Sequence, residues 1–214
     1  MFSADAAAPP FLLKMQVEST QPIADEPGID FALMVQIAEG DHTAFRRLVE
    51  RHQDAVVGTV AKMLGNHSEA EDIAQQVFLR VWKYAKRYRP DAKFTTYLFT
   101  ITRNLVFNES RSRSRRKEVS ADEREEAFNQ TITASPNTQP DAAVLQAELQ
   151  HKVDQAIAQL PELQRMAVIL RQYEQLSYEE IANVLDLSVS AVKSLLFRAR
   201  TTLRETLASY LTER

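Results

Sequence analysis

The chain has 214 residues, of which 44% are hydrophobic, and it contains four glycines, eight prolines and no cysteine. This composition is sufficient for one large domain or two small ones, and the scarcity of glycine favours helices over tight β-turns. Without cysteine the chain has no disulfide, no thiol nucleophile and no zinc finger. The formal net charge of −3 is unfavourable for a nucleic-acid-binding protein unless the charges are unevenly distributed.

The charges are in fact unevenly distributed. Residues 1–30 carry five acidic residues and one lysine, a charge of −4, which leaves +1 for the rest of the chain. The composition of residues 1–30 predicts a flexible acidic N-terminal tail. The longest apolar run, residues 166–170, is far shorter than a membrane span, and the N-terminus does not resemble a secretory signal. We therefore expect a cytoplasmic protein with no membrane insertion.

Residues 31–117 contain three amphipathic helical patterns. The first begins at about Asp41, a predicted N-cap, and ends at Leu64, where a Gly-Asn pair follows as a C-cap signal. Ser68 and Glu71 form a predicted capping box for the second pattern. The third follows a Pro-Asp break. Because each pattern has one apolar face, we expect the three helices to pack together as a bundle.

The character of the chain changes after this bundle. Residues 111–117 are basic, and they are either a solvated charge block at a domain edge or a contact to DNA. Residues 118–140 are first acidic and then rich in Thr, Ser, Asn and Pro, which predicts a flexible linker. A second helical bundle is predicted over residues 141–211. The predicted fold class is therefore all-α, with two small helical bundles joined by a flexible linker.

Residues 176–204 are the most informative part of the sequence. Ser177 and Glu180 form a capping box that opens a short helix, and Ser188 is a predicted cap for a second helix after a brief break. The second helix has a predicted buried stripe of Val192, Leu196, Ala199 and Leu203. Its opposite face carries Lys193, Ser194, Phe197, Arg198 and Arg200. This pattern predicts a helix-turn-helix whose second helix enters the major groove; the alternative is a helical hairpin with a solvated charged face.

Several segments in a fixed order resemble a known family. Residues 40–45 read GDHTAF, residues 70–82 read AEDIAQQVFLRVW, and residues 93–98 read KFTTYL. The C-terminal part adds a Leu-Pro pair at 160–161, LSYEEIA at 176–182 and AVKSLLFRAR at 191–200. Together they resemble the extracytoplasmic-function sigma factors, a two-domain class of bacterial RNA polymerase specificity subunit, over roughly residues 35–207. The chain departs from the usual family residues at Gln76, Tyr97 and Leu195.

The resemblance implies a function and three sites. Residues 31–117 would be sigma region 2, and residues 141–211 would be sigma region 4. The implied partners are core RNA polymerase, through its β′ coiled coil and β flap, promoter DNA as duplex and single strand, and an anti-sigma factor. The implied polymerase-binding residues are Asp72, Gln75, Gln76 and Leu79. Those for the −10 element are Lys93, Phe94, Tyr97, Arg103 and Asn104. Those for the −35 element are Lys193, Ser194, Phe197, Arg198 and Arg200.

Some alternatives stay open at this stage. Phe94 either stacks on an unpaired base, a contact that contributes about 1–3 kcal/mol, or is a core residue of the bundle. The four histidines have no metal-ligand spacing and no glycine-rich phosphate loop is present, so we expect no catalytic residue, metal or cofactor. His52 is expected to be a half-buried core residue. The rival functions are a sigma-like decoy that sequesters an anti-sigma factor and a plain helix-turn-helix regulator.

Overall fold

The computed structural model describes residues 28–120 and 142–212. These residues form eight α-helices, a short 3₁₀ turn and no strand, which confirms the predicted all-α class. Most of the predicted tail and linker lies outside the described residues. The elements in chain order are α1 (Ile29–Ala38), α2 (His42–Leu64), α3 (His67–Tyr84), η2 (Ala85–Arg87), α4 (Phe94–Ser120), α5 (Ala142–Gln159), α6 (Glu162–Gln172), α7 (Tyr178–Leu185) and α8 (Val189–Thr212).

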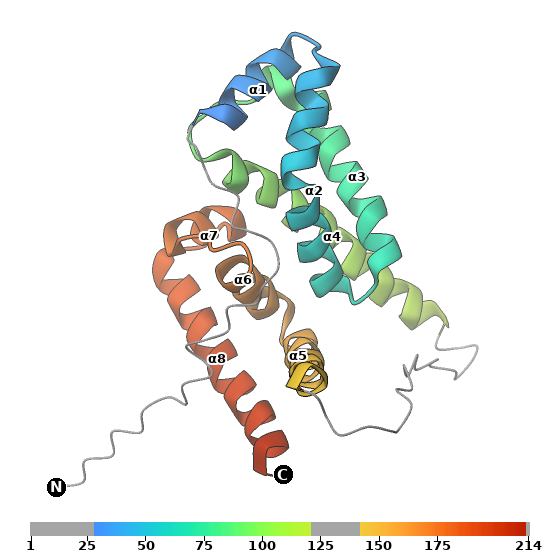
Figure 1. Ribbon diagram of the computed structural model, residues 1–214, viewed down its shortest axis with the longest axis vertical. Coiled ribbons are helices and arrows are strands. Elements are labelled where there is room, and N and C mark those ends of the chain that lie inside the picture. Colours follow the sequence, from blue (N-terminus) through green and yellow to red (C-terminus); the bar gives the residue numbers. More distant parts are fainter. Residues whose placement is uncertain (1–27, 121–141, 213–214) are drawn as a thin grey trace, which may run out of the picture.

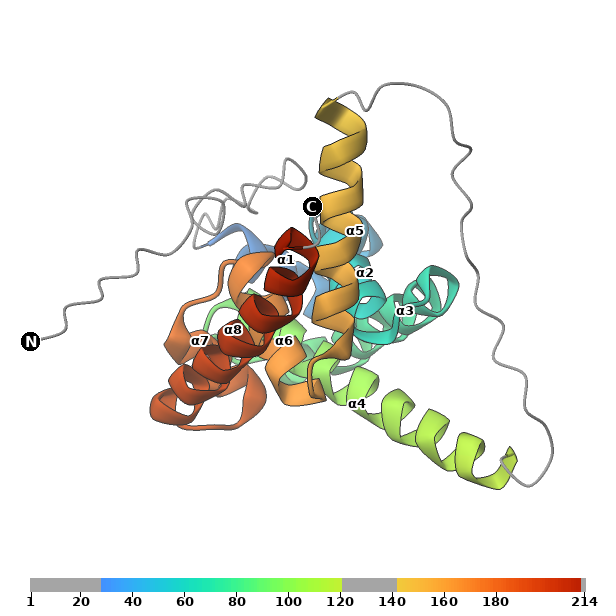
Figure 2. The same ribbon diagram turned by 90° about the horizontal axis from the view of Figure 1, so that it is seen from below.

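The helices form two bundles that lie against each other (Figure 1). Helices α1 to α4 make the first bundle and α5 to α8 the second. Helix α7 packs against α4, while α5 and α6 pack against α2. In the view from below, the C-terminal part of α4 extends past the body of both bundles (Figure 2). In the described ranges, no helix is both long and apolar enough to cross a membrane.

Buried apolar side chains hold the two bundles together internally and to each other. The buried residues of both bundles belong to one continuous hydrophobic cluster. Full burial of a large aliphatic side chain stabilises a fold by about 1.5–3 kcal/mol, so these residues dominate the favourable side of folding. The largest fully buried side chains include Leu48, Leu98 and Phe99 of the first bundle and Ile169, Ile181 and Leu196 of the second.

Local capping signals explain where α2 and α3 begin and end. The Asp41 carboxylate accepts hydrogen bonds from the backbone N–H groups of Thr43 and Ala44, at 2.6 and 3.2 Å, as predicted. Gly65 ends α2 in the left-handed conformation, φ 71°, which a residue without Cβ adopts at little cost. The prediction for α3 was wrong. Its N-cap is Asn66, not Ser68, because Ser68 already lies in the first helical turn and donates its own N–H to Asn66.

Helix α1 was not predicted as a separate element. It begins at Ile29, inside the segment assigned to the acidic tail. Its residues are apolar on more than one side, with Phe31 and Val35 exposed, so no clear 3.6-residue period marks it. Packing against α2 and η2 explains why the segment is nevertheless helical. The face turned to the bundle consists of Asp30, Leu33, Met34 and Ile37.

The basic run of residues 111–117 is the helical continuation of α4, which extends to Ser120, beyond the predicted end of the domain. Arg113 donates a hydrogen bond to the carbonyl of Leu64 at 3.1 Å and forms an ion pair with Glu69 of α3. Arg116 pairs with Glu109 about two turns earlier on α4, at 2.5 Å. Arg113 therefore anchors α4 to the ends of α2 and α3, which is a structural role that the sequence did not indicate.

Candidate nucleic-acid interface

Helices α7 and α8 form the predicted helix-turn-helix. Ser177 and Glu180 make a reciprocal capping box: the Ser177 hydroxyl accepts from the Glu180 N–H at 3.1 Å, and the Glu180 carboxylate accepts from the Ser177 N–H at 2.7 Å. Asp186 ends α7 in the left-handed conformation, φ 57°, which aspartate tolerates better than most residues. The Ser188 hydroxyl then accepts from the N–H of Ala191 and caps α8, as predicted. Both caps fix the turn between the two helices.

Helix α8 has one buried and one exposed face. Val192, Leu196 and Ala199 are buried, and Leu203 is half-buried against the same core. Phe197 is 72% exposed, the most exposed of the large hydrophobic residues in the described ranges. The predicted exposed face is confirmed as a surface, and it comprises Lys193, Ser194, Phe197, Arg198 and Arg200. An aromatic ring surrounded by cations on an accessible helix has the chemistry of a duplex-binding surface.

An aromatic cluster lies where α4 begins. The rings of Phe94, Tyr88 and Tyr97 are within 5.1–6.2 Å of one another. Phe94 is only 4% exposed, which favours its interpretation as a core residue. Tyr88 and Tyr97 are half-buried and reach the surface. Burial raises the pKa of Tyr97, with a smaller contribution from Tyr84, so its hydroxyl stays protonated at neutral pH.

Two cations predicted to contact the −10 element are bound to α7. The Lys93 ammonium lies 3.1 Å from the Glu180 carboxylate. The Arg103 Nε donates to the carbonyl of Val184 at 3.0 Å. Asn104, one residue further along α4, is exposed. Lys93 thus directly precedes α4, and the other predicted −10 residues lie within its first three turns. Part of that surface lies against the helix-turn-helix.

Further contacts between the bundles lie along α2. The Thr59 hydroxyl donates to the Glu174 carboxylate at 2.9 Å, and the Arg165 guanidinium donates to the carbonyl of Met63 at 2.7 Å. The Lys62 ammonium lies 4.5 Å from the centre of the Tyr173 ring. None of these contacts was predicted, because the residues involved lie far apart in the sequence.

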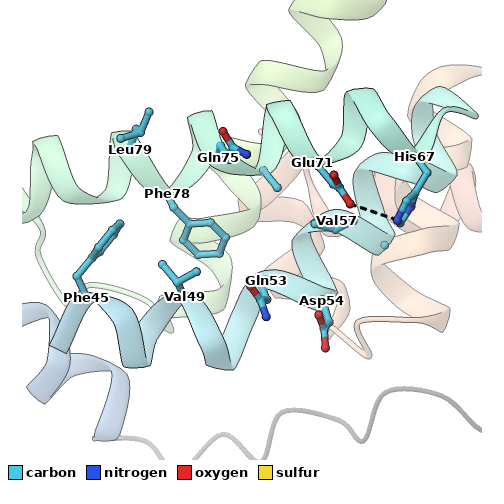
Figure 3. Close-up of a pocket in the computed structure, with 12 residues that line it drawn as sticks. Phe45, Val49, Gln53, Asp54, Val57, His67, Glu71, Gln75, Phe78 and Leu79 are labelled. Atoms are coloured by element: carbon cyan, nitrogen blue, oxygen red, sulfur yellow. Dashed lines mark ion pairs between the residues drawn. The ribbon is translucent and has the colours of Figure 1, made fainter. Parts of the chain in front are cut away.

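The outer face of α3 carries the predicted polymerase-binding residues. Asp72, Gln75, Gln76 and Leu79 are all exposed, as their three- and four-residue spacing predicted. Leu79 is 63% exposed. A groove of about 790 Å³ runs beside this face between α2 and α3 (Figure 3). Its lining combines apolar residues of both helices with polar residues at the edges, namely Phe45, Val49, Val57, Phe78, Gln53, Asp54, Glu71, Gln75 and Leu79.

Asp30 and His52 form a buried pair that sequence reasoning missed. Asp30 was assigned to the acidic tail, and His52 was expected to be half-buried, but His52 is fully buried. His52 Nε2 lies 3.0 Å from Asp30 Oδ2, and Arg51 Nε lies 3.0 Å from Asp30 Oδ1. Burial acts to raise the pKa of Asp30, but the hydrogen bonds and charges of His52 and Arg51 outweigh it and lower that pKa. The only sequence signal was a carboxylate next to the apolar residues of α1.

Comparison with known proteins defines the family. The Sigma-70 region 2 family model matches residues 48–116, and the Sigma-70 region 4 model matches residues 150–203. The chain is 34% identical over 187 residues to the RNA polymerase sigma-H factor of Pseudomonas aeruginosa, covering 86% of this chain and 96% of that protein. It is 32% identical over 176 residues to the ECF RNA polymerase sigma factor SigW of Bacillus subtilis, covering 80% and 93%.

The fold has relatives among solved structures. The structure of CnrH in complex with the cytosolic domain of CnrY matches with a TM-score of 0.61 and 25% identity, covering 85% of this chain and 98% of CnrH. Both family models, the relatives and the order of the motifs agree. The chain belongs to the extracytoplasmic-function sigma factors, which are transcription initiation factors and not enzymes.

Proposed function

We propose that this sigma factor binds core RNA polymerase and directs promoter-specific initiation by reading a −35 duplex with α8 and opening the −10 element at the start of α4. The observation that carries this proposal is the exposed face of α8. The caps at Ser177 and Ser188 fix the start of α7 and of α8, and so hold this face in a defined orientation. Lys193 and Ser194 lie near the start of α8, where side chains of a recognition helix reach base edges. Arg198 and Arg200 lie further along and are suited to phosphates, which set register without specifying sequence.

For the −10 element, the burial pattern divides the roles of the aromatic residues. Phe94 is enclosed by the bundle, so we assign it a supporting role beneath Tyr97. Tyr97 keeps part of its ring accessible, and a base that leaves the duplex can stack on it. Lys93, Arg103 and Asn104 would contact the neighbouring backbone and bases. Unstacking a base costs a few kcal/mol, which one or two such contacts offset. The opening requires no nucleotide hydrolysis, since polymerase-binding energy supports it.

For polymerase docking, the outer face of α3 offers both charge and apolar area. Asp72 and Glu71 provide carboxylates, which suit a basic coiled coil on the β′ subunit and steer association. Leu79 and the groove between α2 and α3 provide a place for apolar side chains (Figure 3). Gln75 borders this groove and can fix orientation through its amide. The β flap would bind the second bundle, as the family resemblance implies.

The arrangement in which the two bundles are in contact, called closed below, affects promoter binding. While Lys93 is paired with Glu180 and Arg103 donates to Val184, part of their charge and hydrogen-bonding capacity is used within the protein and not on DNA. Separation of the two bundles would therefore favour simultaneous use of both promoter surfaces. A partner protein can also act on this equilibrium by binding one arrangement better than the other. An anti-sigma factor, which the family resemblance implies as a partner, could act in this way. The related chain CnrH was solved bound to another protein, the cytosolic domain of CnrY.

Run-off transcription with purified core polymerase over a genomic promoter library tests the proposal. A sigma factor binds the core enzyme and yields specific transcripts from a subset of promoters. A decoy that only sequesters an anti-sigma protein fails in both measurements. Such a decoy has no need of a basic recognition helix, whereas α8 of this chain presents one. A plain helix-turn-helix regulator binds duplex DNA but does not confer promoter-specific initiation on core polymerase. Either of these two results would refute the proposal.

A further inference from the structure

A buried polar cluster lies directly beneath the aromatic residues at the start of α4. The Asp30 carboxylate accepts a hydrogen bond from Arg51 through one oxygen and is paired with His52 through the other, each at 3.0 Å. Asp30 is 6% exposed and His52 is 0% exposed. Burying a carboxylate is unfavourable unless its oxygens are hydrogen-bonded, and here both are. The cluster therefore joins α1 and α2 through a fixed, directional geometry.

The cluster is continuous with the aromatic residues. The His52 ring centre lies 5.0 Å from that of Phe94, with the ring planes tilted by 54°. Phe94 in turn contacts Tyr88 and Tyr97, whose own rings are 5.1 Å apart. A chain of contacts thus runs from a buried carboxylate, through an imidazole and a buried phenyl ring, to two partly exposed phenol rings.

Electrostatics provides a second link between the cluster and the surface. Burial raises the pKa of Tyr88, and the charge of Asp30 contributes in the same direction, followed by Tyr97 and Asp91. The Asp30 carboxylate, whose own pKa is lowered, stays ionised at neutral pH. Its charge acts with burial to keep Tyr88 protonated, the form that a phenol already has at neutral pH, so the ring presented at the surface is neutral. A neutral ring suits stacking next to a negatively charged strand.

We propose that Asp30 and His52 are positioning residues for the −10 element: they hold Phe94 in place, and Phe94 holds Tyr88 and Tyr97 as a preformed stacking platform for an unpaired promoter base. This inference rests on the proposed function of α4. Neither Asp30 nor His52 touches DNA. Their effect is to reduce the ordering that the platform must undergo when a base arrives, which lowers the free-energy cost of binding.

The test uses holoenzyme reconstituted from the full-length chain and core polymerase, with 2-aminopurine placed at each non-template position of the −10 element. The fluorescence change reports a base leaving the stack. His52→Phe keeps an aromatic ring against Phe94 but loses the contact with Asp30. His52→Gln keeps an amide nitrogen that can donate to Asp30. Thr102→Val is the matched control, because it removes a buried hydroxyl of the same bundle that donates to Leu98 within α4.

We expect His52→Phe to slow promoter opening about tenfold, the effect of losing one hydrogen bond to a charged group. Polymerase affinity and binding to the −35 duplex stay unchanged, and His52→Gln restores most of the opening rate. The inference is overturned if His52→Phe opens promoters at the wild-type rate. Thr102→Val is expected to lower the melting temperature of the protein without a selective effect on promoter opening. The inference is also overturned if His52→Phe lowers the melting temperature of the protein, the polymerase affinity and the opening rate together, because that pattern indicates a general loss of stability. A wild-type holoenzyme with no fluorescence change at any −10 position would instead refute the proposed role of α4, and this inference with it.

Discussion

Lys93 and Glu180 join the two bundles where the proposed −10 surface of α4 meets the helix-turn-helix. Lys93 directly precedes α4, and Glu180 lies in the first turn of α7. The Lys93 ammonium is 3.1 Å from the Glu180 carboxylate. Glu180 has a double role, since its other oxygen accepts the Ser177 N–H of the capping box. The hydrogen bond to Ser177 and the charge of Lys93 outweigh the effect of burial and lower the pKa of Glu180. The same carboxylate thus stabilises the helix-turn-helix and occupies a predicted −10 contact.

Replacing Glu180 by Gln should favour separation of the bundles. The amide retains the capping geometry, because Gln can replace Glu in a capping box, but it removes the charge that holds Lys93. A partly exposed ion pair contributes about 0.2–1 kcal/mol, so we expect a shift of up to about fivefold towards the separated arrangement. Energy transfer between a probe on each bundle measures it. Glu179→Gln, at the exposed neighbouring position, is the control; an equal shift in both variants would contradict the assigned role of the pair.

The contact between the bundles should weaken as the pH rises. Burial raises the pKa of Glu174 to about 7, although the hydrogen bond from Thr59 and the charge of Lys62 act to lower it. Separation from α2 removes part of this burial, and the pKa returns towards its ordinary value of 4.5. The proton is therefore bound more tightly in the closed arrangement. The contact between the bundles is therefore strongest at a pH below the ordinary pKa of Glu174, 4.5, and it weakens progressively as the pH rises to the raised value of about 7.

The same energy-transfer measurement checks this pH dependence. We expect the closed fraction to fall severalfold between about pH 5 and about pH 8. Glu174→Gln retains an oxygen that accepts the Thr59 hydrogen bond but does not titrate, so most of the dependence should disappear. If the variant and the wild type follow the same pH profile, then Glu174 is not the group responsible.

Two substitutions on α8 should separate sequence reading from phosphate binding. Lys193→Ala should relax promoter choice, since a specific contact to a base edge contributes about 1–3 kcal/mol of discrimination. Arg200→Ala should weaken binding to every sequence alike and reduce its salt dependence by about one phosphate contact. Footprinting at several salt concentrations on matched and mismatched promoters measures both effects. An equal loss on both kinds of promoter for both variants would refute this division.

Leu79→Ala should weaken polymerase binding without affecting stability. Leu79 is exposed in the structure, so its truncation creates no cavity, while its burial against a partner is lost. We expect a loss of affinity of about tenfold, the range of a moderate interface residue. Val35→Ala, another exposed aliphatic residue of the same bundle, serves as the control and should bind normally. Competition for core polymerase against unmodified protein measures the difference, and wild-type affinity for Leu79→Ala would exclude Leu79 from the docking surface.

The sequence predicted the features that depend on near neighbours in the chain. The bounds of α2 follow from Asp41 and Gly65, and the helix-turn-helix follows from the box of Ser177 and Glu180. The exposed faces of α3 and α8 also follow from local periodicity, because helical geometry alone decides which residues share a face. The same reasoning failed for α1, whose apolar residues show no single face, and for the N-cap of α3, where Asn66 and Ser68 were both suitable and only the path of the backbone selects between them.

Only the tertiary structure could decide which distant side chains meet. Asp30 looked like one more acid of the N-terminal tail until α1 folded back and placed it on His52, 22 residues away. Arg103 and Glu174 contact partners 81 and 115 residues away, on the opposite bundle. No local pattern records such pairs, because their energies depend on how whole helices pack and not on the residues beside them. The sequence by itself determined most of the helices, the N-caps of α2, α7 and α8, and the exposed faces of α3 and α8. Packing decided that the proposed −10 surface rests on the buried contact between Asp30 and His52 and is partly covered by the helix-turn-helix.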